Sequence, residues 1–163
     1  MQFQPATTDI PLVTLVGTEP GDFETLVAIR IEAMRESLER IGRFDPVRAR
    51  ERFREGFSSE STRCIEVSGE RVGFVVIKPL IDGLLLDHLY IKPSAQGAGI
   101  GSVVLSQICV EADAAGMALR VGALRESESN RFYTRHGFQF VESTEFDNYY
   151  VRHPAQGNSA AEI

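Results

Sequence analysis

The chain has 163 residues, of which 43% are hydrophobic and 25% charged, and its formal net charge is -6. This length and composition predict one domain with a packed core and exclude a disordered, collagen-like or disulfide-stapled protein. The acidic charge makes nucleic acid a poor partner, because proteins that follow a phosphate backbone present a basic face.

Targeting and membrane signals are not evident in the sequence. Residues 1–5 have neither the basic nor the apolar region of a secretory signal, and no apolar run approaches the ~20 residues of a membrane helix. We therefore expect a cytoplasmic protein without a membrane partner. Cys64 and Cys109 lie far apart in apolar runs, which predicts two buried thiols and no metal site.

The N-terminal third predicts one strand and two helices. Residues 10–16 are mostly β-branched or apolar, which is typical of a strand. Over residues 22–42 apolar side chains recur at helical spacing. A second helix is expected over residues 47–57, with Asp45 as its N-cap and Pro46 at its first position. Its alternating arginines are interpreted as a solvated helix face.

The middle of the chain predicts an antiparallel arrangement of strands. Residues 63–67 and 72–77 are apolar and β-branched, and a tight turn at residues 68–70 joins them as a hairpin. A second turn at residues 80–83 leads into a longer strand over residues 84–91.

The last part of the chain predicts a crossover into a parallel strand. Pro93 ends the long strand, and a glycine-rich turn at residues 96–101 opens the next helix. The elements expected from there are a helix over 101–115, a strand over 119–124, a short helix over 129–136 and a terminal hairpin of residues 138–141 and 149–151. The fold class predicted is α+β, with helices on a mostly antiparallel sheet, in one domain over residues 1–153 followed by a flexible tail.

The glycine-rich turn is the first candidate binding site. Free N–H groups at a helix start attract anions, and Gly97, Gly99 and Gly101 allow the main chain to approach a pyrophosphate without Cβ clashes. A Walker A loop would need a lysine that the turn lacks. A dinucleotide-binding fingerprint would need a glycine where Ser102 stands, and it would not follow antiparallel strands.

A third interpretation rests on two motifs. The turn from Gln96 to Gly101 matches the Gln/Arg-x-x-Gly-x-Gly/Ala pattern of the GNAT acetyltransferases, and Tyr133 precedes the pair Gly137-Phe138 as in that family. The motifs follow each other in family order with a strand between them. The chain thus resembles the GNAT superfamily of acetyl-CoA-dependent N-acetyltransferases over residues 63–152, which implies a three-layer fold splayed around the glycine-rich turn.

The resemblance implies which residues hold acetyl-CoA. The strand over residues 84–91 would separate from that over 119–124, and the pantetheine arm would lie in the gap. Where many relatives carry an asparagine before the short helix, this chain has Glu126 or Ser127, and we expect Ser127 to face the cofactor because a carboxylate would repel phosphate. The cofactor-binding residues predicted are Leu89, Tyr90, Ile91, Gln96, Gly97, Ala98, Gly99, Ile100, Gly101, Ser102, Ser127, Asn130 and Tyr133.

Acetyl transfer to an amine needs a neutral amine, a stabilised oxyanion and a protonated leaving thiolate. The resemblance implies that a main-chain N–H at Leu89 or Tyr90 serves the oxyanion and that Tyr133 protonates the sulfur. Asp87 or His88 is the candidate base. Because consecutive strand residues face opposite sides, only one of these two is expected to face the acceptor.

The sequence therefore predicts an N-acetyltransferase that transfers an acetyl group from acetyl-CoA to a primary amine, either of a small molecule or of a protein N-terminus or lysine. The alternative is a non-catalytic acyl-CoA-binding or regulatory module on the same fold, against which the presence of Tyr133 argues. No residue identifies a particular amine, and the architecture is compatible with a homodimer.

Overall fold

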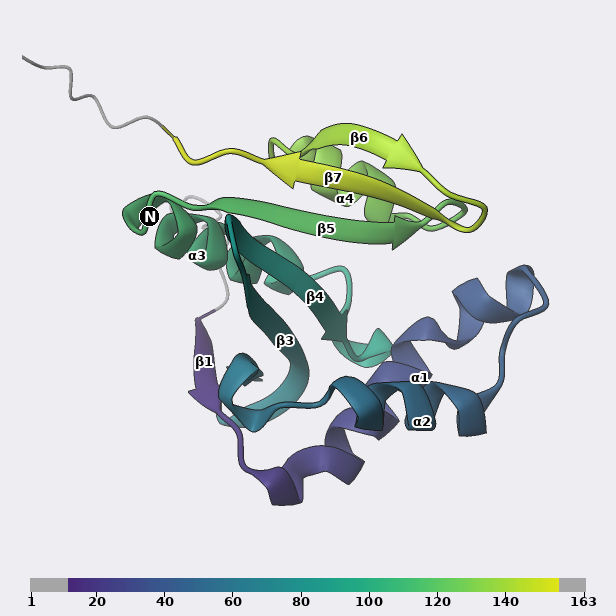
Figure 1. Ribbon diagram of the computed structural model, residues 1–163. Helices are drawn as coiled ribbons and strands as arrows, with labels where there is room; N and C mark the ends of the chain where they lie inside the picture. Colours follow the sequence, from purple (N-terminus) through teal and green to yellow (C-terminus); the bar gives the residue numbers. More distant parts are fainter. Residues whose placement is uncertain (1–11, 156–163) are drawn as a thin grey trace, which may run out of the picture.

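The computed structural model describes residues 12–155, so residues 10 and 11 of the predicted first strand and most of the predicted tail lie outside the described part. Within it, seven strands form one sheet in the order β1-β2-β3-β4-β5-β7-β6 (Figure 1). The elements are β1 (Val13–Gly17), α1 (Phe23–Arg40), α2 (Pro46–Gly56), β2 (Thr62–Val67), β3 (Glu70–Leu80), β4 (Gly83–Ile91), α3 (Ile100–Ala114), β5 (Ala118–Leu124), α4 (Ser129–Arg135), β6 (Gln139–Ser143) and β7 (Asp147–Arg152).

The sheet confirms the predicted α+β class. Every neighbouring pair of strands is antiparallel except β4 and β5, which are parallel and are joined through the glycine-rich turn and α3. A parallel pair needs a crossover connection, and α3 supplies it. None of the helices in residues 12–155 is long and apolar enough to cross a membrane.

Local sequence signals explain where most elements begin and end. The carboxylate of Asp45 accepts the N–H of Arg48 at 3.1 Å and caps α2, as predicted. The β2–β3 turn has positive φ at Ser68 and Gly69, 54° and 79°, which suits a tight hairpin. Strand β3 extends beyond the predicted residue 77, because its last residues pair with the start of β4.

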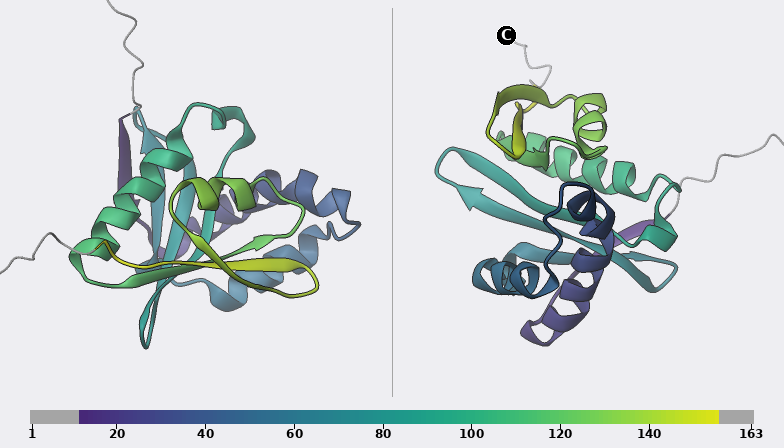
Figure 2. Two further views of the ribbon diagram at one scale, coloured as in Figure 1. Left: turned by 90° about the horizontal axis from the view of Figure 1, so that it is seen from above. Right: turned by 90° about the vertical axis from the view of Figure 1, so that its right-hand side faces the viewer.

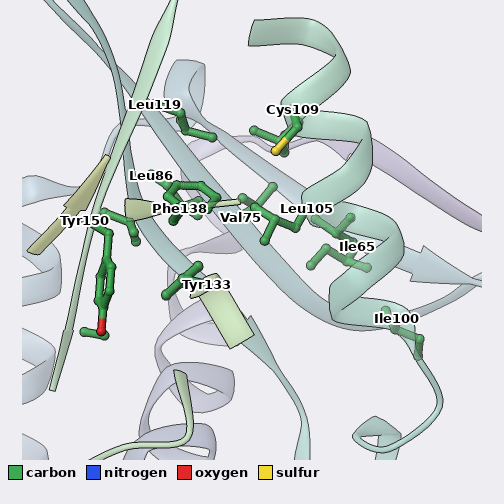
Figure 3. Close-up of a cluster of buried hydrophobic side chains, with 14 of the residues drawn as sticks. Ile65, Val75, Leu86, Ile100, Leu105, Cys109, Leu119, Tyr133, Phe138 and Tyr150 are labelled. Atoms are coloured by element: carbon green, nitrogen blue, oxygen red, sulfur yellow. The ribbon is translucent and has the colours of Figure 1, made fainter. Parts of the chain in front are cut away.

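Two hydrophobic layers cover the two faces of the sheet (Figure 2). Helices α3 and α4 pack on one face, and the labelled side chains of that core, including Leu105, Tyr133 and Phe138, gather between helix and strands in Figure 3. Helices α1 and α2 pack on the other face around Phe53 and Phe74. Both cysteines are buried, as predicted, one in each layer.

The parallel strands β4 and β5 pair over only part of their length. Their register runs from Gly83 opposite Ala118 to Leu86 opposite Val121 and then stops. Beyond that point β5 pairs with β7 alone, and β4 pairs with β3 alone. The two strands diverge toward their C-terminal ends, as Figure 1 shows, and the predicted gap between them is present.

A β-bulge interrupts β4 where this gap opens. Val76 pairs with His88 and the next residue, Ile77, pairs with Leu86, so that Asp87 is the extra residue. The bulge changes which face of the sheet the following side chains occupy. Leu86 and Leu89 therefore both pack in the α3 layer, although strict alternation would separate them.

Candidate functional site

The glycine-rich turn has the backbone of an anion site. Gly97 and Gly99 have φ of 85° and 80°, a conformation that other residues adopt at a cost, and Gly99 is the N-cap of the 15-residue helix α3. The first intrahelical bond runs from the N–H of Val103 to the carbonyl of Gly99 at 3.1 Å. The three N–H groups before it, from Ile100 to Ser102, are therefore free for a ligand.

The turn is open where a pyrophosphate would approach. An added Cβ at Gly97 or Gly99 would meet nothing within 4 Å, and the turn is exposed from Gln96 to Gly99. The side-chain amide of Gln96 donates to the carbonyl of Ile91 at 2.9 Å, which ties the turn to the end of β4. The residues present thus fit a diphosphate, which they would hold where β4 ends and α3 begins.

The unpaired half of β4 lines one side of that gap. Leu89, Tyr90 and Ile91, the predicted pantetheine contacts, all lie beyond the last β4–β5 pair. Their main-chain groups on the β5 side lack a strand partner. Such an edge can bind an extended ligand by hydrogen bonds, as an added strand would.

Tyr133 approaches the gap from α4. Its side chain is buried among Phe132 and Phe138, with ring centroids 5.3 and 5.4 Å away. Burial, and to a smaller extent the neighbouring Tyr90, raises the pKa of Tyr133 well above its ordinary value. Its hydroxyl forms no hydrogen bond within residues 12–155. Tyr133 is therefore a neutral phenol whose proton is free to be donated.

Asp87 and His88 both lie on the α1–α2 side of β4, so the expectation that these consecutive strand residues face opposite sides is wrong. Oδ2 of Asp87 lies 3.6 Å from Nε2 of His88 and 3.2 Å from Nζ of Lys78, whose side chain reaches the carbonyl of Gly56 at the end of α2. The bulge at Asp87 is the cause, because it suspends the alternation on which the prediction rested.

Burial decides the charge of His88. The ring packs against Phe53 and Phe74, with centroids 5.5 and 6.4 Å away. Burial lowers the pKa of His88 to about 4, although the Asp87 carboxylate opposes the shift. The imidazole is therefore neutral at physiological pH, with one N–H and one acceptor nitrogen.

The side chain of Asn130, a predicted cofactor contact, is engaged within the protein. Its amide nitrogen donates to the carbonyls of Leu124 at 2.8 Å and Ser127 at 2.9 Å, and its oxygen accepts from Asn148 and Tyr150. These bonds use the capacity of the amide. A cofactor contact through this side chain would require one of them to break, and the main-chain N–H of Asn130 is also engaged, with the carbonyl of Ser127 at 3.4 Å.

Ser127 is half-buried at the β5–α4 turn. Its hydroxyl donates to the carbonyl of Leu124 at 2.8 Å, while Glu126 beside it is exposed. Both residues line a concavity of about 260 Å³ between the end of α1, the β5–α4 turn and the β6–β7 turn. Its other lining residues are Ile41, Leu124, Arg125, Glu145 and Phe146. Ser127 keeps oxygen lone pairs for a ligand, and its cofactor contact stays a prediction.

Sequence reasoning missed two cations beside His88. Lys78 comes from β3, and Arg30 comes from α1, where its guanidinium carbon lies 6.0 Å from the ring centroids of both Phe53 and Tyr90. Neither residue belongs to a motif. Only the packing of α1 and β3 against the bulged strand brings them to the site.

A comparison with protein families matches residues 59–140 to the acetyltransferase (GNAT) domain. Among curated proteins, the [ribosomal protein bS18]-alanine N-acetyltransferase of Haemophilus influenzae is 30% identical over 93 residues. The alignment spans 56% of this chain and 62% of that protein, so it covers less than two thirds of the relative.

Solved structures share the fold. The PaiA N-acetyltransferase of Thermoplasma acidophilum, solved in complex with coenzyme A, superposes with a TM-score of 0.72 at 18% identity over 87% of this chain and 99% of that one. The ribosomal-protein-S18-alanine N-acetyltransferase of Escherichia coli gives 0.65 at 15% identity, over 93% and 100% of the two chains. At such identities the likeness concerns the fold alone. The family match, which spans half of the sequence, settles the classification: this chain belongs to the GNAT acetyltransferase domain family of enzymes.

Proposed function

We propose that the protein transfers an acetyl group from acetyl-CoA to a primary amine by direct attack of the amine on the thioester. The observation that carries this proposal is the gap between β4 and β5, which has the glycine-rich turn at its mouth and the buried phenol of Tyr133 beside it. Acetyl-CoA supplies the thioester. Residues of this chain bind acetyl-CoA, polarise the thioester carbonyl, accept the proton of the amine and donate a proton to the sulfur.

The binding role falls to backbone groups. The N–H groups at the start of α3 hold the pyrophosphate, and the unpaired edge of β4 holds the pantetheine arm. A main-chain N–H at Leu89 or Tyr90 stabilises the oxyanion, because a fixed donor in a water-poor gap costs no reorganisation when charge develops.

Two side chains move the protons. As the amine attacks, its proton goes to the Asp87 carboxylate, directly or through one water, because only Oδ2 of that carboxylate is engaged with Lys78 and His88. The electron pair of the breaking C–S bond leaves on sulfur, and Tyr133 donates its phenolic proton there. The raised pKa keeps that proton on Tyr133 until a thiolate forms.

The relative from Haemophilus influenzae, which is named for N-acetylation of an alanine of ribosomal protein bS18, suggests which acceptor class to test. A peptide α-amine is therefore the first acceptor to test, followed by lysine side chains and small amines. The concavity of about 260 Å³ between the end of α1 and the β6–β7 turn is the proposed entrance for a chain end. A cytoplasmic location and a homodimer are further parts of the proposal.

The test is a thermal-shift titration with acetyl-CoA. A ligand at ~100 times its Kd stabilises the folded protein by about 2.7 kcal/mol, which raises the unfolding midpoint measurably. An adenine nucleotide without pantetheine is the control. No shift at millimolar acetyl-CoA would contradict the proposal. A shift without acetylation of any amine would instead favour a non-catalytic acyl-CoA-binding module.

A further inference from the structure

Polar side chains form a continuous row on the α1–α2 face of the sheet, which we call the β4 polar row: Lys78 from β3 and Asp87, His88 and Tyr90 from β4. Lys78 contacts Asp87, Asp87 contacts His88, and Nδ1 of His88 lies 3.3 Å from the hydroxyl of Tyr90. The rings of His88 and Tyr90 are adjacent, with centroids 5.5 Å apart. The row therefore runs from the end of α2 into the unpaired half of β4.

The positions of the protons in this row follow from its chemistry. The neutral imidazole of His88 carries a single N–H, and the carboxylate of Asp87 can only accept a hydrogen bond. The N–H is therefore on Nε2, toward Asp87, and Nδ1 is the acceptor. The hydroxyl of Tyr90 must then be the donor to Nδ1. The Asp87 carboxylate, with Oδ2 3.6 Å from Nε2, favours this tautomer through its charge rather than through a hydrogen bond.

The groups that face His88 support its neutral state. Burial against Phe53 and Phe74 disfavours the imidazolium, and so do the cations Arg30 from α1 and Lys78 from β3, while Asp87 opposes them. Helix α2 contributes the uncharged ring of Phe53 to this contact.

A hydroxyl whose proton is committed can only accept. The side chain of Arg30 already contributes a hydrogen bond to the Tyr90 oxygen, and the remaining lone pair matches an amine N–H as donor. Arg30 lies 6.0 Å from the Tyr90 ring centroid, and a second cation there would be repelled. The arrangement favours the uncharged amine, which is the form with a lone pair for attack.

The position of Tyr90 suits such a contact. It lies on the segment of β4 that has no β5 partner, and the charge of its phenol would contribute to the raised pKa of Tyr133. The proposed amine and the proposed leaving sulfur would thus be served by two tyrosines from different elements.

We propose that Tyr90 is the catalytic residue that receives the acceptor: its hydroxyl oxygen binds an N–H of the uncharged amine and orients the amine lone pair toward the thioester. His88, held in its Nε2–H form by Asp87, is the positioning residue that holds the Tyr90 proton. No proton is transferred to either residue. This inference rests on the proposed acetyl transfer and adds to it a residue that selects the form of the amine.

The first arm of the test needs no acceptor. In protein labelled with 15N-histidine, the His88 signals are those that disappear in His88→Asn. We expect Nε2 protonated and Nδ1 unprotonated at about pH 6, where an ordinary histidine is partly charged. In Tyr90→Phe the pKa of His88 should rise, because the neutral ring loses a donor. An Nδ1–H form, or a charged ring at that pH, would overturn the proposal.

The second arm measures turnover with two probes, a peptide that begins with alanine and hydroxylamine. Tyr90→Phe should lower kcat/KM by ~10-fold or more, because orientation of the nucleophile is lost, and should leave the stabilisation by acetyl-CoA unchanged. His88→Leu should behave like Tyr90→Phe. His88→Asn should recover most of the rate, because its amide oxygen can replace Nδ1 as the acceptor for Tyr90.

The control is Tyr150→Phe. It removes a hydroxyl that donates to the side-chain oxygen of Asn130 at 2.8 Å and lies outside the β4 polar row. It should lower the unfolding midpoint without lowering kcat/KM. Unchanged turnover in Tyr90→Phe would overturn the inference and leave acetyl transfer intact. If wild-type protein neither binds acetyl-CoA nor releases CoA with either probe, the proposed function fails. The proposal that Tyr90 receives the amine then fails with it, even if NMR shows the expected Nε2–H form of His88.

Discussion

The side-chain oxygen of Asn130 accepts a hydrogen bond from the hydroxyl of Tyr150, 2.8 Å away, and this bond ties the first turn of α4 to β7. The amide nitrogen of the same residue holds the β5–α4 turn through main-chain carbonyls. Asn130 thus joins three segments that surround the gap.

Asn130→Ala should lower the free energy of unfolding by about 2–3 kcal/mol, since several bonds are lost together and each contributes about 1 kcal/mol. Tyr150→Phe should cost about 1 kcal/mol. Urea denaturation measures both. A loss below about 0.5 kcal/mol in Asn130→Ala, with weaker acetyl-CoA binding, would instead assign this side chain to the cofactor.

Gly99→Ala should destabilise the protein by about 1–2 kcal/mol, because the N-cap of α3 has φ of 80° and an L-residue pays for that conformation. Gly101→Ala is the matched control. Its Cβ would stand 3.4 Å from the Phe132 ring, an ordinary contact, and helical alanine is favoured over glycine. Equal midpoints for the two variants in thermal unfolding would contradict the geometry of the turn.

Tyr133→Phe should leave stability within about 0.5 kcal/mol of wild type, because the hydroxyl has no hydrogen bond within residues 12–155 and the ring packing is kept. Acetyl-CoA should still bind. The acetylation rate should fall by ~100-fold, the usual contribution of a general acid. A variant with full kcat would show that another group protonates the sulfur.

Stability should depend on the protonation of His88. Its pKa in the folded protein is about 4 against an ordinary 6.5, so the unfolded chain binds the proton more readily. The stabilising effect is complete above the ordinary pKa and is lost as pH falls toward 4. Between pH 7 and 5 the free energy of unfolding should fall by about 2 kcal/mol from this group. In His88→Asn that part of the slope should disappear, and its persistence would argue against a buried neutral ring.

Asp113 should contribute in a lower pH range. Arg152 holds it by two bonds of 2.8 and 3.0 Å, and these bonds together with the N–H of Ala155 lower its pKa to about 2. A depressed carboxyl pKa stabilises the folded state above pH 3.8 and the benefit is lost as pH falls toward 2. Asp113→Asn should therefore cost about 2 kcal/mol at neutral pH. The difference from wild type should shrink below pH 3, and a pH-independent difference would exclude the ion pair as its source.

The order and type of the elements could be predicted from the sequence, because their signals are local. The cap at Asp45, the hairpin turn at Ser68 and Gly69, and the glycine-rich turn before α3 each involve neighbouring residues. The bounds differ by a few residues where strands extend through pairing, as β3 does past residue 77. Pairing depends on a partner strand, so a local pattern sets it poorly.

The residues of the candidate site also fall into those that the sequence pattern indicates and those that only the packing brings together. The glycines of the turn and Tyr133 carry spacing signals in the sequence, and the structure brings them to the two sides of one gap. Asp87, His88 and Tyr90 were candidates from the family resemblance, but no sequence signal joins them to Lys78 in one row, because these side chains meet only through the contacts of β3, β4 and α2.

The sequence by itself determined where the chain turns, which helix start is free for an anion and which tyrosine stands before the Gly137-Phe138 pair. Tertiary structure alone decided that Asp87 and His88 share a face. The pairing of β3 with β4 leaves one residue of β4 over, and the resulting bulge reverses the side-chain alternation from that point. A period-two pattern holds only while every residue of a strand is paired, and that condition is set by residues distant in the chain.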